Sequence, residues 1–149
     1  MFIILHMENE LVLHTNGSNI IYITCFYQLI PLYFGLHYRV YDISIVTGIL
    51  FCTSINYWRK PIKNSIRRYI DISWVLFGMY YHLYLIYYYS LSNKYYYMIG
   101  TGSLLYPIEY QIPKNNYYRI AICHSLLQII ACNICTSICH DIHLRNITY

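Results

Sequence analysis

Long uncharged stretches alternate with short charged clusters along this 149-residue chain. A membrane-spanning helix needs roughly 20 mostly apolar residues. Five stretches approach that length, at residues 19–38, 41–58, 70–92, 95–112 and 118–140. The pattern therefore predicts an all-α fold, a polytopic transmembrane bundle of about five helices (four to six) that forms a single integral membrane domain over residues 1–149.

Two of these stretches contain residues that disfavour a regular helix. Pro31 should kink the first span, because proline removes a backbone donor and crowds the preceding turn. In 95–112, Gly100, Gly102, Pro107 and Glu109 fit a broken or re-entrant helix equally well. The bundle has four spans if that stretch does not cross the membrane.

The short segment at residues 59–69 holds half of the ten Lys and Arg residues. These are Arg59, Lys60, Lys63, Arg67 and Arg68. Basic residues in short loops stay on the cytoplasmic side, so they set the orientation and are placed to meet anionic lipid headgroups. The N-terminus and the 113–119 turn then share that side, whereas the 39–42 and 91–94 turns and the C-terminus face the opposite side.

The composition supports a membrane setting. The chain is 58% hydrophobic and 11% charged, whereas soluble domains average about 25% charged residues. A net charge of +4, concentrated in one loop, argues against a nucleic-acid partner. The expected partners are the lipid bilayer and other membrane proteins, or a second copy of this chain.

Three polar residues share a depth on this threading. At 1.5 Å per helical residue, Ser54, Asp71 and His124 lie within roughly 4 to 9 Å of the basic-loop surface. Ionisable groups inside a membrane face inward and pair. The sequence therefore predicts a polar cluster of Ser54, Asp71 and His124, with His82 as a fourth member.

The third helix places its polar residues on one stripe. Asp71, Gly78 and His82 fall at i, i+7 and i+11, together with Val75. That stripe could face Ser54 and His124.

Simpler structural roles remain open for each of these residues. Asp71 could cap its own helix or pair with Arg67 or Arg68. Ser54 could bond a backbone carbonyl one turn back, and the histidines could be satisfied interior side chains.

The six cysteines lie inside apolar stretches, which predicts small packing residues and not a disulfide framework. On the last helix a single face carries His124, Gln128, Cys132, Cys135, Cys139 and His143. Ligands in line on one helix cannot wrap a zinc ion without partners from elsewhere. Neither a metal site nor a cofactor is predicted from these residues.

Ser54-x3-Trp58, the basic stretch, Asp71 and His124-x3-Gln128 together resemble the pattern of alkaline ceramidases. Those enzymes belong, with progestin and adipoQ receptors, to a superfamily of seven-helix zinc-dependent membrane hydrolases. The resemblance implies that Ser54, Asp71 and His124 occupy the family's matching places, with Trp58 and Gln128 standing where two zinc-ligand histidines are expected. It points to a divergent or degenerate relative, and zinc is expected only on that reading.

A second resemblance is to small multi-pass membrane proteins of large DNA viruses. "SINYWRKP" and "RRYIDI" resemble the Ser-Ile-Asn-Tyr-Trp-Arg, basic-loop and Ile-Asp pattern of that group. This resemblance implies a host or virion membrane with 59–69 on the cytoplasmic side, and it carries no established activity.

The sequence thus favours a multi-pass membrane protein of structural or interaction type over an enzyme. The first alternative is a membrane-embedded metal-dependent lipid hydrolase. The second is a small channel or transporter subunit in which Glu109 and His82 would line a shared pathway.

Overall fold

The computed structural model describes residues 13, 15–113 and 116–148. Every element in that part of the chain is helical, which confirms the all-α class. The elements are α1 (Thr15–Thr24), the 3₁₀ turn η1 (Cys25–Gln28), α2 (Leu29–His37), α3 (Tyr41–Trp58), α4 (Ile66–Tyr88), α5 (Lys94–Gln111) and α6 (Tyr117–Thr148). The N-terminal segment 1–12 and Lys114 of the expected 113–119 turn lie outside the described residues.

The first rod consists of α1, η1 and α2 and runs from Thr15 to His37. Its irregularity is the η1 turn, which ends three residues before Pro31. Pro31 lacks an N–H for the Tyr27 carbonyl and its ring crowds that carbonyl, so a tighter turn there is the expected accommodation. The kink predicted at Pro31 therefore takes the form of a short 3₁₀ segment.

Helices α4 and α6 differ from their expected boundaries, and the structure resolves the alternative left open for α5. Helix α4 begins at Ile66, earlier than expected, because Ser65 caps it: the Arg68 N–H donates to Ser65 Oγ at 3.3 Å. Helix α5 is one uninterrupted helix with Pro107 inside it. Helix α6 continues beyond 140 through the expected polar tail, since Asp141 and Arg145 are fastened to neighbouring segments (below).

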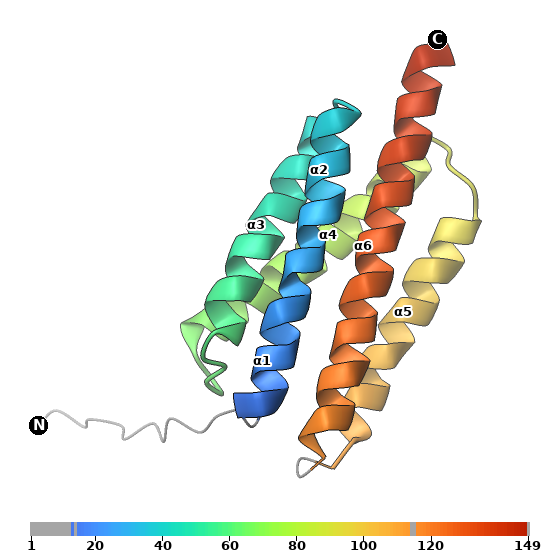
Figure 1. Cartoon of the computed structure of the whole chain (residues 1–149). Helices are drawn as coiled ribbons and strands as arrows, with labels where there is room; N and C mark the ends of the chain where they lie inside the picture. The colour runs from blue at the N-terminus through green and yellow to red at the C-terminus, as the bar shows by residue number, and fades with distance from the viewer. Residues whose placement is uncertain (1–12, 14, 114–115, 149) are drawn as a thin grey trace, which may run out of the picture.

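The helices form a ring that opens at one seam (Figure 1). The first rod packs beside α3 and α6, α3 beside α4, and α5 beside α6, whereas α4 and α5 touch over a shorter stretch. Helix α4 crosses obliquely behind the other helices (Figure 1). We call the end with the 59–65 loop and the α5–α6 turn the basic end, and the end with the C-terminus of α6 the C-terminal end.

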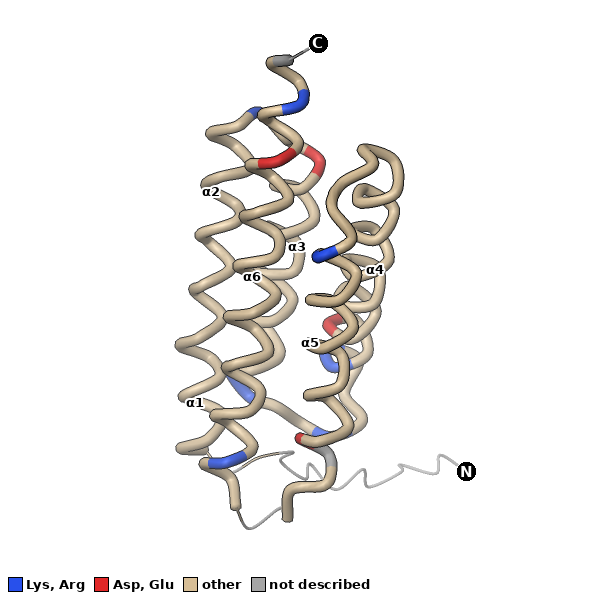
Figure 2. The backbone as a smooth tube through the Cα atoms, turned by 90° about the vertical axis from the view of Figure 1, so that its right-hand side faces the viewer, with Lys and Arg blue, Asp and Glu red and all other residues tan. Residues whose placement is uncertain are grey.

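The apolar residues are divided between a small interior and a large exterior. A buried cluster at the C-terminal end includes Ile43, Ile86 and Ile138, and a second at the basic end includes Ile21 and Trp58. Large apolar side chains are also exposed on every helix. Most Lys, Arg, Asp and Glu lie toward the two ends of the described bundle, whereas charged residues at the start of α5 and in α4 lie nearer its middle (Figure 2).

The six cysteines are all free thiols, as the sequence predicted. Cys132 and Cys139 are buried between α6 and its neighbours, whereas Cys52 is exposed. The buried thiols Cys132 and Cys139 fill space beside α6.

Candidate functional site

Ser54 and Asp71 meet directly at the basic end. Ser54 Oγ donates to Asp71 Oδ1 at 2.8 Å, and Thr53 Oγ1 lies 3.1 Å from the same oxygen. Ser54 and Asp71 are 3% and 7% exposed, so this contact is sealed from the surroundings. The Ser54 hydroxyl thus bonds a side chain on the next helix; Thr53 is the residue that also reaches a carbonyl one turn back, that of Leu50, at 3.1 Å.

The capping and ion-pair roles considered for Asp71 are filled by other residues. Ser65 caps α4, and Asp71 lies more than one turn inside the helix. Arg67 donates to the carbonyls of Asn56 and Lys60 at 3.3 and 3.4 Å. Carbonyls at the end of a helix lack intrahelical partners, so Arg67 closes the end of α3.

His124 on α6 reaches this region through Trp58. The Trp58 and His124 ring centroids are 4.7 Å apart, and Trp58 lies one turn after Ser54 on α3. The Nδ1 of His124 lies 3.0 and 3.2 Å from the two carboxylate oxygens of Glu109, on α5. The structure therefore brings Ser54 and Asp71 into direct contact. His124 lies near them through its contact with Trp58, and it pairs with Glu109, a partner that the sequence did not indicate.

Gln128 ties α6 to the first rod. Thr24 Oγ1 donates to Gln128 Oε1 at 2.5 Å, and Gln128 Nε2 donates to Cys25 Sγ at 3.4 Å. Ser125 Oγ lies 3.2 Å from the same Thr24 hydroxyl. We define the basic-end network as Thr24, Thr53, Ser54, Trp58, Asp71, Glu109, His124 and Gln128, a set that draws on all five rods.

The residues of this network do not fit a zinc ion. Trp58 offers no lone pair to a metal, Gln128 is engaged by Thr24 and Cys25, and the Nδ1 of His124 faces Glu109. Catalytic zinc takes three protein ligands, and the described residues contain no group of three His, Cys, Asp or Glu side chains that could hold a metal. The two positions where the resemblance implies histidine ligands are occupied by packing and hydrogen-bonding side chains.

His82 lies apart from the network. It is eleven residues beyond Asp71, about 16 Å along α4, and its Nδ1 is 2.6 Å from the Gly78 carbonyl. His82 is 4% exposed, and its Nε2 has no hydrogen-bond partner in the described part of the chain. Asp71, Gly78 and His82 are buried on the stripe of α4 that they share, whereas Val75 on the same stripe is 50% exposed. Within this stripe Asp71 is the residue that contacts Ser54.

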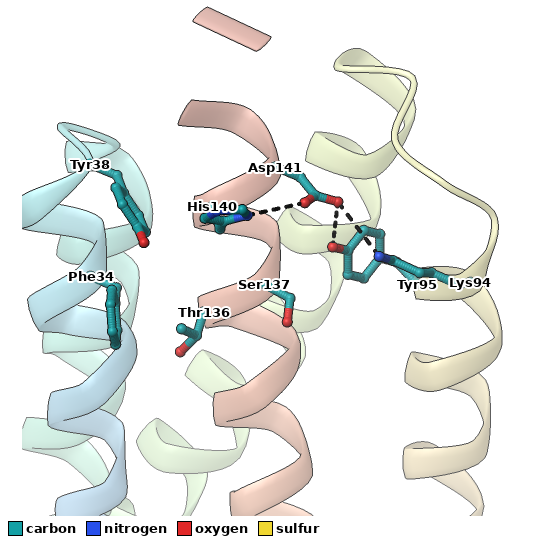
Figure 3. Close-up of a pocket in the computed structure, with 8 residues that line it drawn as sticks. All are labelled: Phe34, Tyr38, Lys94, Tyr95, Thr136, Ser137, His140 and Asp141. Carbon is teal, nitrogen blue, oxygen red and sulfur yellow. Dashed lines mark hydrogen bonds and ion pairs between the residues drawn. The ribbon is translucent and has the colours of Figure 1, made fainter. Parts of the chain in front are cut away.

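A second polar site at the C-terminal end was not predicted. A groove of about 390 Å³ crosses α6 between α2 and α5 (Figure 3). We call it the Asp141 groove; it is lined by Phe34, Tyr38, Lys94, Tyr95, Thr136, Ser137, His140 and Asp141.

Asp141 organises the α5 side of this groove. Its Oδ2 accepts a hydrogen bond from the buried Tyr95 hydroxyl at 2.6 Å and lies 3.8 Å from Lys94 Nζ. Its Oδ1 lies 3.6 Å from His140 Nδ1. In the last turn of α6, Arg145 donates to the Ser90 carbonyl at 2.9 Å. The i,i+4 spacing of Asp141 and Arg145 is typical of a continuing helix and was the available signal.

The α2 side of the groove is aromatic. The Phe34 and Tyr38 ring centroids are 5.6 Å apart. Tyr38 also meets His140 edge to face at 5.7 Å and stacks on His143 at 4.8 Å. In Figure 3, His140 points toward Tyr38, whereas Asp141 points toward Tyr95 and Lys94.

Comparisons with protein-family models, with curated proteins and with solved structures found no match to this chain. Functional conclusions therefore rest on the geometry of the two polar sites and on the distribution of apolar surface.

Proposed function

We propose that this chain is a multi-pass integral membrane protein of structural or interaction type, without a catalytic centre. The supporting observation is its inverted polarity. Ile45, Tyr87 and Leu104 are 64%, 78% and 63% exposed, whereas Ser54 and Asp71 are almost fully buried. Exposing so many apolar side chains to water is unfavourable. Lipid solvates them, and in lipid the polar groups are more stable when they pair inside the bundle.

The two most apolar rods support the same proposal. Thr15–His37 and Tyr117–Ile147 are long and apolar enough to cross a membrane. Only 22% and 33% of their most apolar windows are buried, whereas the core helix of a soluble protein would be mostly covered. The other helices carry more tyrosine, whose ring and hydroxyl suit the membrane–water boundary.

The orientation follows from the loop between α3 and α4. Arg59, Lys60 and Lys63 lie in it, and Arg67 and Arg68 in the first turn of α4. On the positive-inside rule the basic end is cytoplasmic. The resemblance to small viral membrane proteins favours a host or virion membrane as the location.

The basic-end network supports a fastening role. Its side chains make three groups of contacts between helices: Thr53 and Ser54 with Asp71, Trp58 and Glu109 with His124, and Thr24 with Gln128. The Ser54 hydroxyl is buried in the first of these groups. We infer that the network holds the five rods in register, so that the lipid-facing surface can associate with the bilayer, other membrane proteins or a second copy.

Carbonate extraction and site-directed labelling test this proposal. We expect the expressed chain to stay in the membrane pellet at alkaline pH and to need detergent for release. A charged, impermeant maleimide should label Ser92→Cys from the outside and Lys60→Cys only after the membrane is opened, with the unsubstituted chain as the blank. Release by carbonate would refute membrane integration. Labelling of Ser92→Cys and Lys60→Cys from the same side would show that the chain between them does not cross the membrane an odd number of times.

The hydrolase alternative keeps one supporting observation, the contact of Ser54 with Asp71 near His124. Metal analysis of the purified protein separates the two proposals. A fastening network predicts far less than one zinc per chain; one zinc per chain that is lost in His124→Ala would favour the hydrolase. The channel alternative has no such support, because Glu109 bonds His124 and His82 bonds Gly78 at different depths.

A further inference from the structure

The basic end of the bundle presents cations from two separate segments of the chain. Arg59, Lys60 and Lys63 are exposed in the loop between α3 and α4. Arg119 is exposed in the first turn of α6. Figure 2 shows Lys and Arg positions at this end, opposite the C-terminus. The sequence assigned the positive charge of this end to the loop, and the structure adds the start of α6.

The carboxylates at this end are turned inward. Asp71 is 7% exposed, and the side chain of Glu109, which contacts His124, is 15% exposed. In the described part of the chain the basic end therefore has no exposed carboxylate. The C-terminal end differs, because the exposed Asp42 and the half-buried Asp141 accompany its Lys and Arg residues. The exposed positive charge of the molecule is thus concentrated at one end.

The two basic segments border the same packed surface. Trp58, which precedes Arg59, lies 4.7 Å from His124 between ring centroids. His124 is five residues after Arg119, about 7.5 Å along α6. Trp58 and Ala121 also belong to one buried cluster. The end of α3 and the start of α6 therefore pack together, and their cations lie around one contact.

Arg67 fixes the backbone of the loop. Its guanidinium donates to the carbonyls of Asn56 and Lys60 at 3.3 and 3.4 Å. The Lys60 backbone is thereby fastened to the start of α4, while the Lys60 side chain stays exposed. Arg67 is committed to the fold, and the cations available to an external partner are those beside it.

Exposed tyrosines accompany the cations of this end. Tyr69 follows Arg68, Tyr118 precedes Arg119, and both tyrosines are exposed. A tyrosine ring with its hydroxyl suits the membrane–water boundary, which favours lipid over an acidic protein as the partner. Under the proposed membrane function this boundary is that of the cytoplasmic leaflet, whose anionic phospholipids attract Lys and Arg residues near the surface.

We propose that the basic end binds the headgroups of anionic phospholipids through Arg59, Lys60 and Arg119. The loop and the start of α6 each contribute cations to this surface. The inference deepens the proposed membrane function and rests on it, since it names the lipid class that meets one end of the bundle and the residues that meet it.

Competition between two lipids for the purified full-length chain tests the inference. The protein in non-ionic detergent is incubated with phosphatidylglycerol and phosphatidylcholine in equal amounts, and bound lipid is counted by native mass spectrometry. We expect phosphatidylglycerol to be retained preferentially, and sodium chloride to weaken the preference because salt screens exposed charges. Arg59→Gln, Lys60→Gln and Arg119→Gln should each lower its retention roughly fivefold, the effect of one cation near an anionic surface.

Matched variants make the test specific. Lys94→Gln removes an exposed cation nearer the C-terminal end and should leave the preference unchanged. Arg59→Lys keeps the charge and should keep the preference. Equal retention of the two lipids by the unsubstituted chain would overturn the inference, and so would a loss in Lys94→Gln as large as that in Lys60→Gln.

Inorganic phosphate distinguishes a lipid surface from a site for free phosphate. At matched ionic strength, phosphate should displace no more phosphatidylglycerol than sodium chloride does. Greater displacement by phosphate would overturn the assignment to lipid, because the cations would then recognise the phosphate group by itself.

Failure of this inference is distinguishable from failure of the membrane proposal. A chain that needs detergent for release but retains lipid without regard to Arg59, Lys60 and Arg119 refutes only the anionic-lipid surface. A chain released by carbonate refutes the membrane function itself. Helix content by circular dichroism is measured for each variant. Should one glutamine variant lose helix, the other two still test the surface.

Discussion

The two ends of the bundle use the same kind of bond in different surroundings. At the basic end the Ser54 hydroxyl donates to Asp71 at 2.8 Å, and at the C-terminal end the Tyr95 hydroxyl donates to Asp141 at 2.6 Å. Asp71 is 7% exposed, whereas the side chain of Asp141 is 32% exposed beside an open groove. The hydrogen-bond distances at the two sites are similar, and the sites differ in how far the carboxylate is exposed.

This difference indicates which polar groups are committed to the fold. In the basic-end network each group is turned toward a neighbouring helix, and a buried group that loses its partner is costly. In the Asp141 groove the carboxylate and the Lys94 ammonium keep accessible surface, so a ligand or water can replace a missing partner. We therefore expect substitutions in the basic-end network to lower the free energy of unfolding, and substitutions in the Asp141 groove to change what binds there.

Removing the two carboxylates gives the largest expected contrast. Asp71→Ala leaves the Ser54 and Thr53 hydroxyls facing a small void, and we expect the free energy of unfolding to fall by about 1–3 kcal/mol. Asp141→Ala should lower it by about 1 kcal/mol, because the Asp141 side chain is 32% exposed and water can replace it as the acceptor for the Tyr95 hydroxyl. Both are measured by titrating the detergent-solubilised protein with sodium dodecyl sulfate and following helix content.

Asp71→Asn is the matched control for that comparison. It keeps an oxygen that accepts from Ser54 and removes the cost of a buried charge, so we expect stability close to that of the unsubstituted chain. Equal losses in Asp71→Ala and Asp141→Ala would mean that burial does not separate the two ends.

Close backbone packing gives the next contrast. A Cβ at Gly35 would overlap Ser44 Oγ and lie 3.2 Å from Ser44 N and 3.3 Å from Val40 O. Gly35→Ala should therefore push α2 away from α3, lowering the free energy of unfolding by about 1–2 kcal/mol. Because Phe34 is the adjacent residue, the aromatic wall of the groove should move with it.

Gly100→Ala is the control for Gly35→Ala, since a Cβ at Gly100 meets nothing within 4 Å. It should be neutral or stabilise α5 by up to about 1 kcal/mol through helix propensity. The same detergent titration measures both, and a loss at Gly100 as large as that at Gly35 would contradict the packing argument.

The smallest expected effect comes from Tyr95→Phe. The variant keeps the buried ring and removes only the hydroxyl that donates to Asp141. We expect a loss of about 0.5–1 kcal/mol, because Asp141 can rebind Lys94 or water. A loss exceeding that of Asp71→Ala would reverse the proposed ranking of the two ends.

Much of the helical layout was predictable because charges and turn residues interrupt long apolar stretches. The second helix was predicted at 41–58 and observed at Tyr41–Trp58. Errors arose where tertiary contacts override local signals. Helix α6 continues past 140 because Asp141 and Arg145 are bound by Tyr95 and Ser90. Helix α5 was predicted at 95–112 and is observed at Lys94–Gln111, with Pro107 inside it.

The candidate site was predictable only in part for a related reason. Helix length gives depth, and depth placed Ser54 and Asp71 at one level. Depth says nothing about which neighbours a helix has, so the partnership of Glu109 with His124 and that of Gln128 with Thr24 were missed. Glu109 fitted either a broken helix or a channel lining in the sequence, and its contact with His124 on α6 could not be read from the sequence of α5.

The sequence separations within the basic-end network carry a consequence for biosynthesis. Ser54 and Asp71 are 17 residues apart, so α3 and α4 can associate as soon as both have left the ribosome. Thr24 and Gln128 are 104 residues apart, and the first rod must wait until α6 has been made. Until then Thr24 and Cys25 lack their hydrogen-bond partner Gln128 on α6. A nascent chain halted before Tyr117 would thus expose the first rod's seam to quality-control proteases, which makes α6 the checkpoint for completing the bundle.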